Sequence, residues 1–171
     1  MTEQRVSSVQ GRCWTFGHNI PTDRLVKTRY VVEPMAEIVK HVLEDLNPRF
    51  PVEVRTGDIV VAGRHFGQSS GRAIAVKALK ATGVSCVVAE SLARTFSRNC
   101  FEIGLAALEI PGITDEVSDG DEASVDLVAG RFRNLTTGTE RVVAPPDPFL
   151  MEMLAAGGLI KLAATRPDWL S

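Results

Sequence analysis

The chain has few of the residues that form metal sites. Its 171 residues include only three cysteines and three histidines. Cys13, Cys86 and Cys100 show no CxxC or other metal-ligand spacing, and the histidines form no HExxH motif. An Fe–S cluster needs several thiolates close together, which this chain alone does not offer. We therefore expect no metal site here, and we interpret Cys86 and Cys100 as core residues.

Long apolar runs and an excess of one charge are also missing. No segment approaches the roughly 18 apolar residues that span a bilayer. Residues 1–8 are polar and lack the apolar centre of a signal peptide. A net charge of −2 gives no bulk attraction to nucleic acid or to a membrane. We expect a cytoplasmic protein with a single domain over residues 1–171, because 44% of the residues are hydrophobic.

Strand and helix patterns alternate through the middle of the chain. Continuous apolar runs predict strands at 58–63, 84–89 and 105–110. Helical periodicity predicts helices between them, one over 73–82 and one capped by Ser91 that ends at Gly104. Short apolar strands joined by helices favour parallel pairing with right-handed crossovers. The pattern predicts an α/β fold with a mostly parallel βαβαβ core.

Less regular segments flank this predicted core. Before it we predict a strand at 11–17, a loop at 18–23, and a helix from Pro34, at its first position, to Leu46. After it we predict short strands at 123–129, 131–135 and 140–144, with a hairpin turn at Thr137-Gly138. Asp147 is expected to cap a final helix that Gly157-Gly158 interrupts. The core therefore carries an added antiparallel β-section and a C-terminal helix.

The most informative segment is the loop His65–Arg72, with the sequence HFGQSSGR, which joins a predicted strand to the helix beginning at Ala73. Small residues before a helix present backbone N–H groups at the positive end of its dipole, which favours an anion. The loop lacks both the GxGxxG spacing and the Lys-Ser/Thr pair of nucleotide sites, and GxSxG is absent as well. A carboxylate is therefore the favoured ligand.

Two residue types in the loop suit a carboxylate substrate. The planar guanidinium of Arg72 binds both oxygens of a carboxylate at once. A serine hydroxyl becomes a useful base where positive charge and N–H groups stabilise its alkoxide. The sequence leaves two interpretations: a serine that moves a proton beside a bound carboxylate, or a pair, Ser69 and Ser70, that only caps the helix.

Three stretches resemble one known family. Residues 60–72, VVAGRHFGQSSGR, resemble the ILVAGxNFGxGSSRE signature of the aconitase superfamily's swivelling domain. Residues 19–23, NIPTD, are similar to its N-I-x-T-D loop, and residues 74–105 to its segment containing A-L-K, R-N and G-L. The resemblance runs from about Gly11 to beyond Ala156. It implies a swivelling β/β/α domain, and length and motif order resemble the stand-alone small subunits of isopropylmalate dehydratases.

The resemblance implies half of a hydro-lyase. In the family a separate large subunit carries a [4Fe–4S] cluster, and the small subunit contributes a serine base and carboxylate-binding groups. The reaction removes and adds water reversibly on a 2-hydroxy di- or tricarboxylic acid, here 2-isopropylmalate to 3-isopropylmalate in leucine biosynthesis. Three alternatives stay open: another acid such as methylmalate, dimethylmalate or homocitrate, a non-catalytic binding or regulatory subunit, and a free-standing carboxylate-binding protein.

Matching the motifs residue by residue implies roles for several positions. Ser70 falls on the family's catalytic serine, Arg72 on its carboxylate-binding arginine and Asp23 on its active-site aspartate. The other substrate-binding candidates are Thr22, Arg29, Ser69 and Gly71. Arg29 belongs to the expected substrate-selecting loop, around Thr28–Pro34, and is placed to meet a distal polar group.

The chain also departs from the family's Gly-Ser-Ser-Arg-Glu pattern. It has Ser69-Ser70-Gly71-Arg72-Ala73, which removes a hydroxyl at position 71 and a carboxylate at position 73. His18 stands where an aspartate is common. These changes suggest a paralogue for another hydroxyacid or reduced activity, and a register in which Ser69 is the base stays open.

Overall fold

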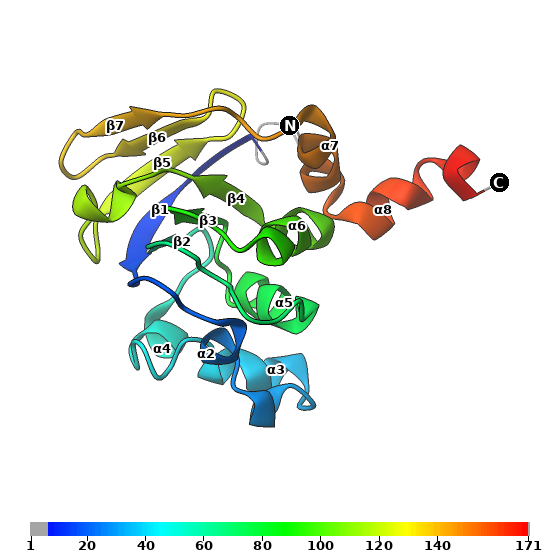
Figure 1. Ribbon diagram of the computed structural model, residues 1–171, viewed down its shortest axis with the longest axis horizontal. Helices are drawn as coiled ribbons and strands as arrows, with labels where there is room; N and C mark the ends of the chain where they lie inside the picture. The colour runs from blue at the N-terminus through cyan, green and yellow to red at the C-terminus, as the bar shows by residue number, and fades with distance from the viewer. Residues whose placement is uncertain (1–6, 171) are drawn as a thin grey trace.

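The computed structural model describes residues 7–170, which form a seven-stranded mixed sheet with helices packed against it (Figure 1). Residues 1–6 and 171, part of the predicted single domain, lie outside the described residues. The strand order is β4-β3-β2-β1-β5-β6-β7. The strands are β1 (Ser8–Thr15), β2 (Ile59–Ala62), β3 (Cys86–Ala89), β4 (Ala106–Glu109), β5 (Glu122–Asp126), β6 (Arg131–Asn134) and β7 (Glu140–Val142).

Strand directions confirm the predicted architecture. Strands β1 to β4 pair in parallel, whereas β5 to β7 are antiparallel and join the sheet through β1. The helices and 3-10 turns are α2 (Thr22–Leu25), η1 (Thr28–Tyr30), α3 (Met35–Ile38), η2 (Val39–His41), α4 (Phe50–Glu53), α5 (Ala73–Ala81), α6 (Arg94–Ile103), η3 (Ile113–Asp115), α7 (Pro148–Ala156), α8 (Leu159–Ala164) and η4 (Pro167–Leu170). The fold is an α/β domain with an antiparallel β-section and C-terminal helices.

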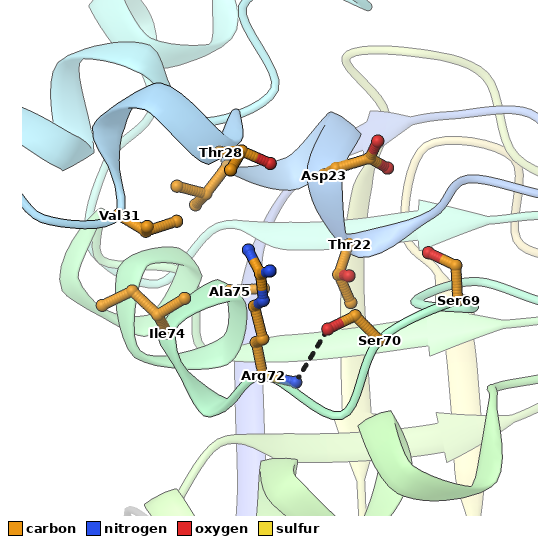
Figure 2. A pocket seen from close by; sticks show the side chains of 10 residues that line it. Thr22, Asp23, Thr28, Val31, Ser69, Ser70, Arg72, Ile74 and Ala75 are labelled. Atoms are coloured by element: carbon orange, nitrogen blue, oxygen red, sulfur yellow. Dashed lines mark hydrogen bonds between the residues drawn. The ribbon is translucent and has the colours of Figure 1, made fainter.

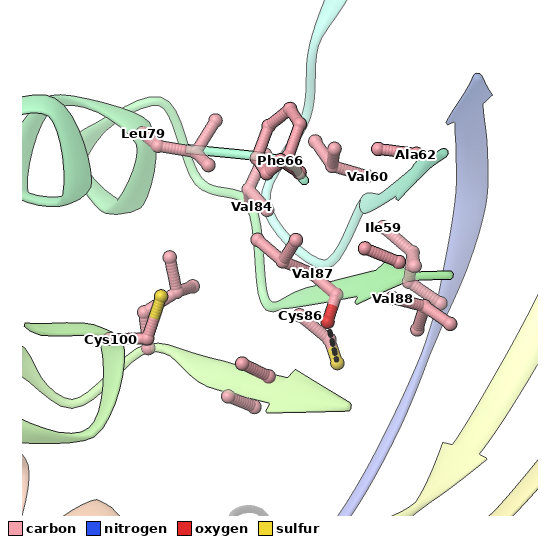
Figure 3. Packing of buried hydrophobic residues seen from close by; sticks show 14 of the residues in the cluster. Ile59, Val60, Ala62, Phe66, Leu79, Val84, Cys86, Val87, Val88 and Cys100 are labelled. Carbon is pink, nitrogen blue, oxygen red and sulfur yellow. Dashed lines mark hydrogen bonds between the residues drawn. The ribbon is translucent and has the colours of Figure 1, made fainter. Parts of the chain in front are cut away.

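The continuous apolar runs form the buried centre of the sheet. Every residue of β2 and β3 is buried, with α5 and α6 beside these strands in Figure 1 and η3 in contact with both of them. Figure 3 shows Leu79 of α5 packed beside Phe66 and Val84. A parallel strand that is buried on both faces has no polar alternation, which is why its sequence is a continuous apolar run.

The predicted helix from Pro34 to Leu46 is wrong beyond its first turn. Only Met35–Ile38 is α-helical, and Pro34 lies before it at the N-cap rather than in the first helical position. A 3-10 turn follows, then Val42 is extended and Leu43 adopts a φ of 56°. Both side chains are fully buried, and the Leu43 N–H donates to the Leu25 carbonyl at 3.0 Å. Packing against the core therefore overrides the helical pattern.

Some predicted element ends are confirmed and others are wrong. Gly104 ends α6 with a φ of 85°, and the Asp147 carboxylate caps α7 by accepting from the Phe149 N–H at 2.8 Å. Ser91 does not cap α6, because the helix begins three residues later and the Ser91 hydroxyl accepts from the His65 N–H. The first strand begins at residue 8 rather than 11, and the predicted loop at 18–23 ends in the first residues of α2.

The three thiols are expected to be inert in the folded protein. Cys13, Cys86 and Cys100 are all fully buried. Burial raises the pKa of Cys13 and Cys86 to about 12 and also raises the pKa of Cys100. Because the thiolate is the reactive form, a disulfide reagent at pH 8 should label no thiol before unfolding and all three in guanidinium. Rapid labelling of the native chain would contradict this burial.

Among residues 7–170, no helix is both long and apolar enough to cross a bilayer.

Candidate active site

The predicted functional loop lies at the carboxyl end of β2, between two extended segments. On one side Pro21 pairs with Gln68, and on the other Phe66 pairs with Leu92, each as a parallel bridge. The Gly67 N–H donates to the carbonyl of Ile20 at 2.8 Å. The two loops that carry the family motifs, 19–23 and 65–72, are therefore held side by side at one edge of the sheet.

Two glycines allow this close approach. A Cβ at position 63 would collide with the imidazole of His18, and a Cβ at position 67 would collide with Phe96. Gly67 also has a φ of 79°, which a residue with a side chain adopts only with strain. His18 accepts a hydrogen bond at Nδ1 from the Arg64 N–H at 2.8 Å. Imidazole here performs the acceptor role that an aspartate carboxylate would also perform.

The loop and the α2–η1 segment enclose a pocket of about 220 Å³ (Figure 2). Its lining residues are Thr22, Asp23, Val26, Thr28, Val31, Ser69, Ser70, Arg72, Ile74 and Ala75. Five of the seven predicted site residues are among them. Gly71 lines a second hollow of about 240 Å³ across the loop, which shares both serines. Arg29 lines neither, because its guanidinium lies over the ring of Tyr30 at 4.7 Å.

The two serines differ in conformation and burial. Ser70 is half-buried, and its Oγ accepts from the backbone N–H of Arg72 at 3.3 Å, the dashed line in Figure 2. Ser69 is exposed and has a φ of 79°, the left-handed region that favours glycine. The N-cap residue of α5 is Arg72, and among residues 7–170 no side chain caps this helix. The interpretation that the serines only cap the helix is therefore wrong.

The sequence did not indicate the apolar side of the pocket. Val26, Val31 and Ile74 face the same space as Arg72, so a charged group and aliphatic carbons meet there. Val26 and Val31 lie in short turns without a regular hydrophobic period, so no pattern marked them. Asn99 of α6 also supports the loop, since its amide donates to the Gly71 carbonyl at 3.1 Å. In the sequence, Asn99 was indicated only as part of the Arg-Asn pair of the family motif.

Within the described part of the chain, no group of three or more His, Cys, Asp or Glu residues is placed to hold a metal ion. The three cysteines are buried in the core, away from the pocket residues. The residues present therefore do not fit an iron–sulfur cluster bound by this chain itself.

Comparison with known proteins agrees with this geometry. The family description "Aconitase C-terminal domain" matches residues 18–112, which include both loops of the pocket. A crystal structure of 3-isopropylmalate dehydratase from Methanocaldococcus jannaschii superposes with a TM-score of 0.88 at 32% identity, covering 95% of this chain and 97% of that one. Fold and site together define an α/β domain of the aconitase C-terminal class.

Curated relatives narrow this class. The 3-isopropylmalate dehydratase small subunit of Thermodesulfovibrio yellowstonii is 43% identical over 159 residues, 92% of this chain and 95% of the relative. Small subunit 1 of Archaeoglobus fulgidus is 48% identical over 155 residues, 90% and 95% of the two chains. The isopropylmalate/citramalate isomerase small subunit of M. jannaschii is 43% identical over 155 residues, 90% and 92%. The chain belongs to the family of 3-isopropylmalate dehydratase small subunits.

Proposed function

We propose that this chain is the small subunit of a [4Fe–4S] hydro-lyase that interconverts 2-isopropylmalate and 3-isopropylmalate. The observation that carries the proposal is the pocket, where a guanidinium, a half-buried hydroxyl and aliphatic side chains meet. These are the groups needed to hold a carboxylate, to move a proton beside it and to contain a branched alkyl substituent. The names of the relatives point to the same acid.

Ser70 is the proposed base. The Arg72 backbone N–H already donates to its Oγ, the N-terminus of α5 lies two residues away, and the Arg72 guanidinium lines the same pocket. Each of these favours the alkoxide over the neutral hydroxyl. Ser70 then takes the proton from the carbon next to a substrate carboxylate. The backbone of Ser69 supports this register, because its positive φ matches the glycine that precedes the serine in the family pattern.

The other pocket residues bind and orient the acid. Arg72 holds one carboxylate through its fork of N–H donors. Thr22 is 4% exposed and contributes its hydroxyl from the first residue of α2, and Asp23 at the pocket rim orients the base or the substrate. The exposed Gly71 offers backbone contacts on the other side of the loop, and the proposed distal role of Arg29 would require its side chain to leave Tyr30.

The proposal requires a large partner subunit that carries the cluster and covers the pocket. When bound there, the cluster supplies a Lewis acid for the hydroxyl that leaves. This chain then supplies the proton acceptor, the carboxylate clamp and a wall that excludes water. The term "small subunit" in the names of the relatives supports a division of the active site between two chains.

Reconstitution with a candidate cluster-bearing subunit tests the proposed function. We expect the two chains to co-purify and the complex to turn over 2-isopropylmalate. Neither chain alone should turn over this acid. Citramalate, dimethylmalate and homocitrate complete the panel, since citramalate appears in the name of one relative. The aliphatic wall predicts that kcat/KM for isopropylmalate exceeds that for citramalate by about tenfold or more. A complex that acts only on another acid, or chains that do not associate, would contradict the proposal.

A further inference from the structure

The turn that forms one wall of the pocket is only partly packed on the hydrophobic core. Thr28 and Val31 line the pocket. The 3-10 turn η1, which begins at Thr28 and ends just before Val31, contains no fully buried residue. Its backbone hydrogen bonds run from the Tyr30 N–H to the Lys27 carbonyl, from the Val31 N–H to the Thr28 carbonyl and from the Glu33 N–H to the Tyr30 carbonyl. So short a turn is not stable by itself. Tyr30 and Val31 pack partly against the hydrophobic core, and side-chain contacts with η2 add to that packing.

A stack of side chains makes these contacts with η2, formed by Arg29, Tyr30 and His41 and here called the Tyr30 stack. The Tyr30 ring and the His41 imidazole are parallel within 6°, with centroids 3.9 Å apart. The Arg29 guanidinium lies 4.7 Å from the centre of the Tyr30 ring and donates to its hydroxyl at 2.9 Å. Stacked rings and cations over aromatic faces attract each other beyond simple burial. The stack therefore joins η1 to η2.

The Glu44 carboxylate links Lys27, at the start of the turn, to His41 of the stack. One of its oxygens lies 2.7 Å from His41 Nδ1 and the other accepts from Lys27 Nζ at 2.8 Å. Lys27 also contacts Asp45 at 2.7 Å. Burial alone would raise the pKa of Glu44, but hydrogen bonds from Lys27 and His41 hold it below its ordinary value. Hydrogen bonds that Lys27 donates to Asp45 and Glu44 raise the pKa of Lys27. Both groups are thus charged at neutral pH.

The segment that carries His41 and Glu44 is itself anchored to the core. Val42 and Leu43, between them in sequence, are fully buried, and the Leu43 N–H donates to the Leu25 carbonyl. The left-handed backbone at Leu43 directs this segment away from the helical path begun by α3. The anchored segment is therefore a fixed platform, and the pocket wall is attached to it through the Tyr30 stack and Glu44.

We propose that the Tyr30 stack and Glu44 are positioning residues, which set the distance of the Thr28–Val31 wall from Arg72 and so select the size of the substrate's alkyl group. Neither His41 nor Glu44 lines the pocket. They act through the wall, so their loss weakens binding of a branched substrate without removing the base or the carboxylate clamp. This inference rests on the proposed function for the identity of the acid.

His41→Ala in the reconstituted complex tests the proposal. We expect KM for 2-isopropylmalate to rise about tenfold with kcat changed less than about threefold, and the preference over citramalate to shrink. His41→Phe, which keeps a ring against Tyr30, should recover most of the KM and the preference. A general loss of folding would not change the ratio between two substrates. Unchanged KM and preference in His41→Ala, with an active wild-type complex, would overturn the positioning role and leave the proposed function standing.

A matched control and a second readout separate the two proposals. Glu37 forms an exposed ion pair with Lys40 at 2.7 Å in the same region, and Glu37→Gln should behave as wild type. Amide hydrogen exchange of the chain alone needs no substrate. In His41→Ala the Tyr30 and Val31 amides should exchange about tenfold faster while those of β2 stay protected. Unaltered exchange at these two amides would overturn the positioning role even if the wild-type complex failed to act on isopropylmalate.

Discussion

Replacing Ser70 by alanine is expected to lower kcat of the reconstituted complex about 10³-fold, because the pocket then lacks its proton acceptor. Assembly with the large subunit should be unchanged. The Ser70 hydroxyl oxygen accepts its hydrogen bond within the loop, from the Arg72 N–H. The measurement is kcat at saturating 2-isopropylmalate, together with the ratio of the two subunits after co-purification.

Ser69 provides the matched control for this loss. Ser69→Gly removes an exposed hydroxyl one residue away and places glycine at a φ of 79°, where it is unstrained. We expect activity close to wild type and an equal or higher melting temperature. If Ser69→Gly abolishes turnover while Ser70→Ala retains it, the register is shifted by one residue and the base is Ser69.

Replacing Arg72 by lysine is expected to lower kcat/KM for 2-isopropylmalate about 10²-fold, mainly through KM. Lysine keeps the positive charge but loses the planar pair of donors that matches a carboxylate. Arg72→Ala should cost more, because an anion would then enter a pocket without a cation. Initial rates over a wide range of substrate concentration separate the effects on KM and kcat.

Arg64 is the control for the arginine. Arg64 is exposed and lies, like Arg72, between β2 and α5. Its hydrogen bond to His18 is made by the backbone N–H and not by the guanidinium. Its side chain is not among those that line the pocket. Arg64→Lys should therefore leave KM unchanged. Equal losses in the two lysine variants would show a general attraction of the anion to positive charge and would contradict a specific carboxylate clamp at Arg72.

The parallel core and the placement of the site could be predicted because each depends on a local pattern. A strand buried on both faces must be apolar at every position, as Ile59–Ala62 and Cys86–Ala89 are. Since parallel strands end at one edge of the sheet, the loop after the first of them must lie at that edge. The family motifs then indicated Ser70, Arg72 and Asp23, which line one pocket.

The region from Thr22 to Glu53 could not be predicted, because its structure is set by tertiary contacts. Pro34–Leu46 has a helical apolar period, yet burial of Val42 and Leu43 breaks the helix. The elements there are single turns of three or four residues, too short for a periodic pattern. The family resemblance indicated a substrate-selecting loop around Thr28–Pro34, but the Tyr30 stack behind it was not predicted. This stack depends on side chains that meet across turns.

Cleavage of the substrate's C–H bond tests most directly whether the Ser70 hydroxyl of this chain completes a site on another subunit. Substrate deuterated at the carbon next to the carboxylate is incubated with each complex, and loss of label from that carbon is followed by NMR. We predict that the Ser70→Ala complex binds substrate within about threefold of wild type but breaks the bond about 10³-fold more slowly. Bond cleavage at the wild-type rate in Ser70→Ala would contradict this role of Ser70.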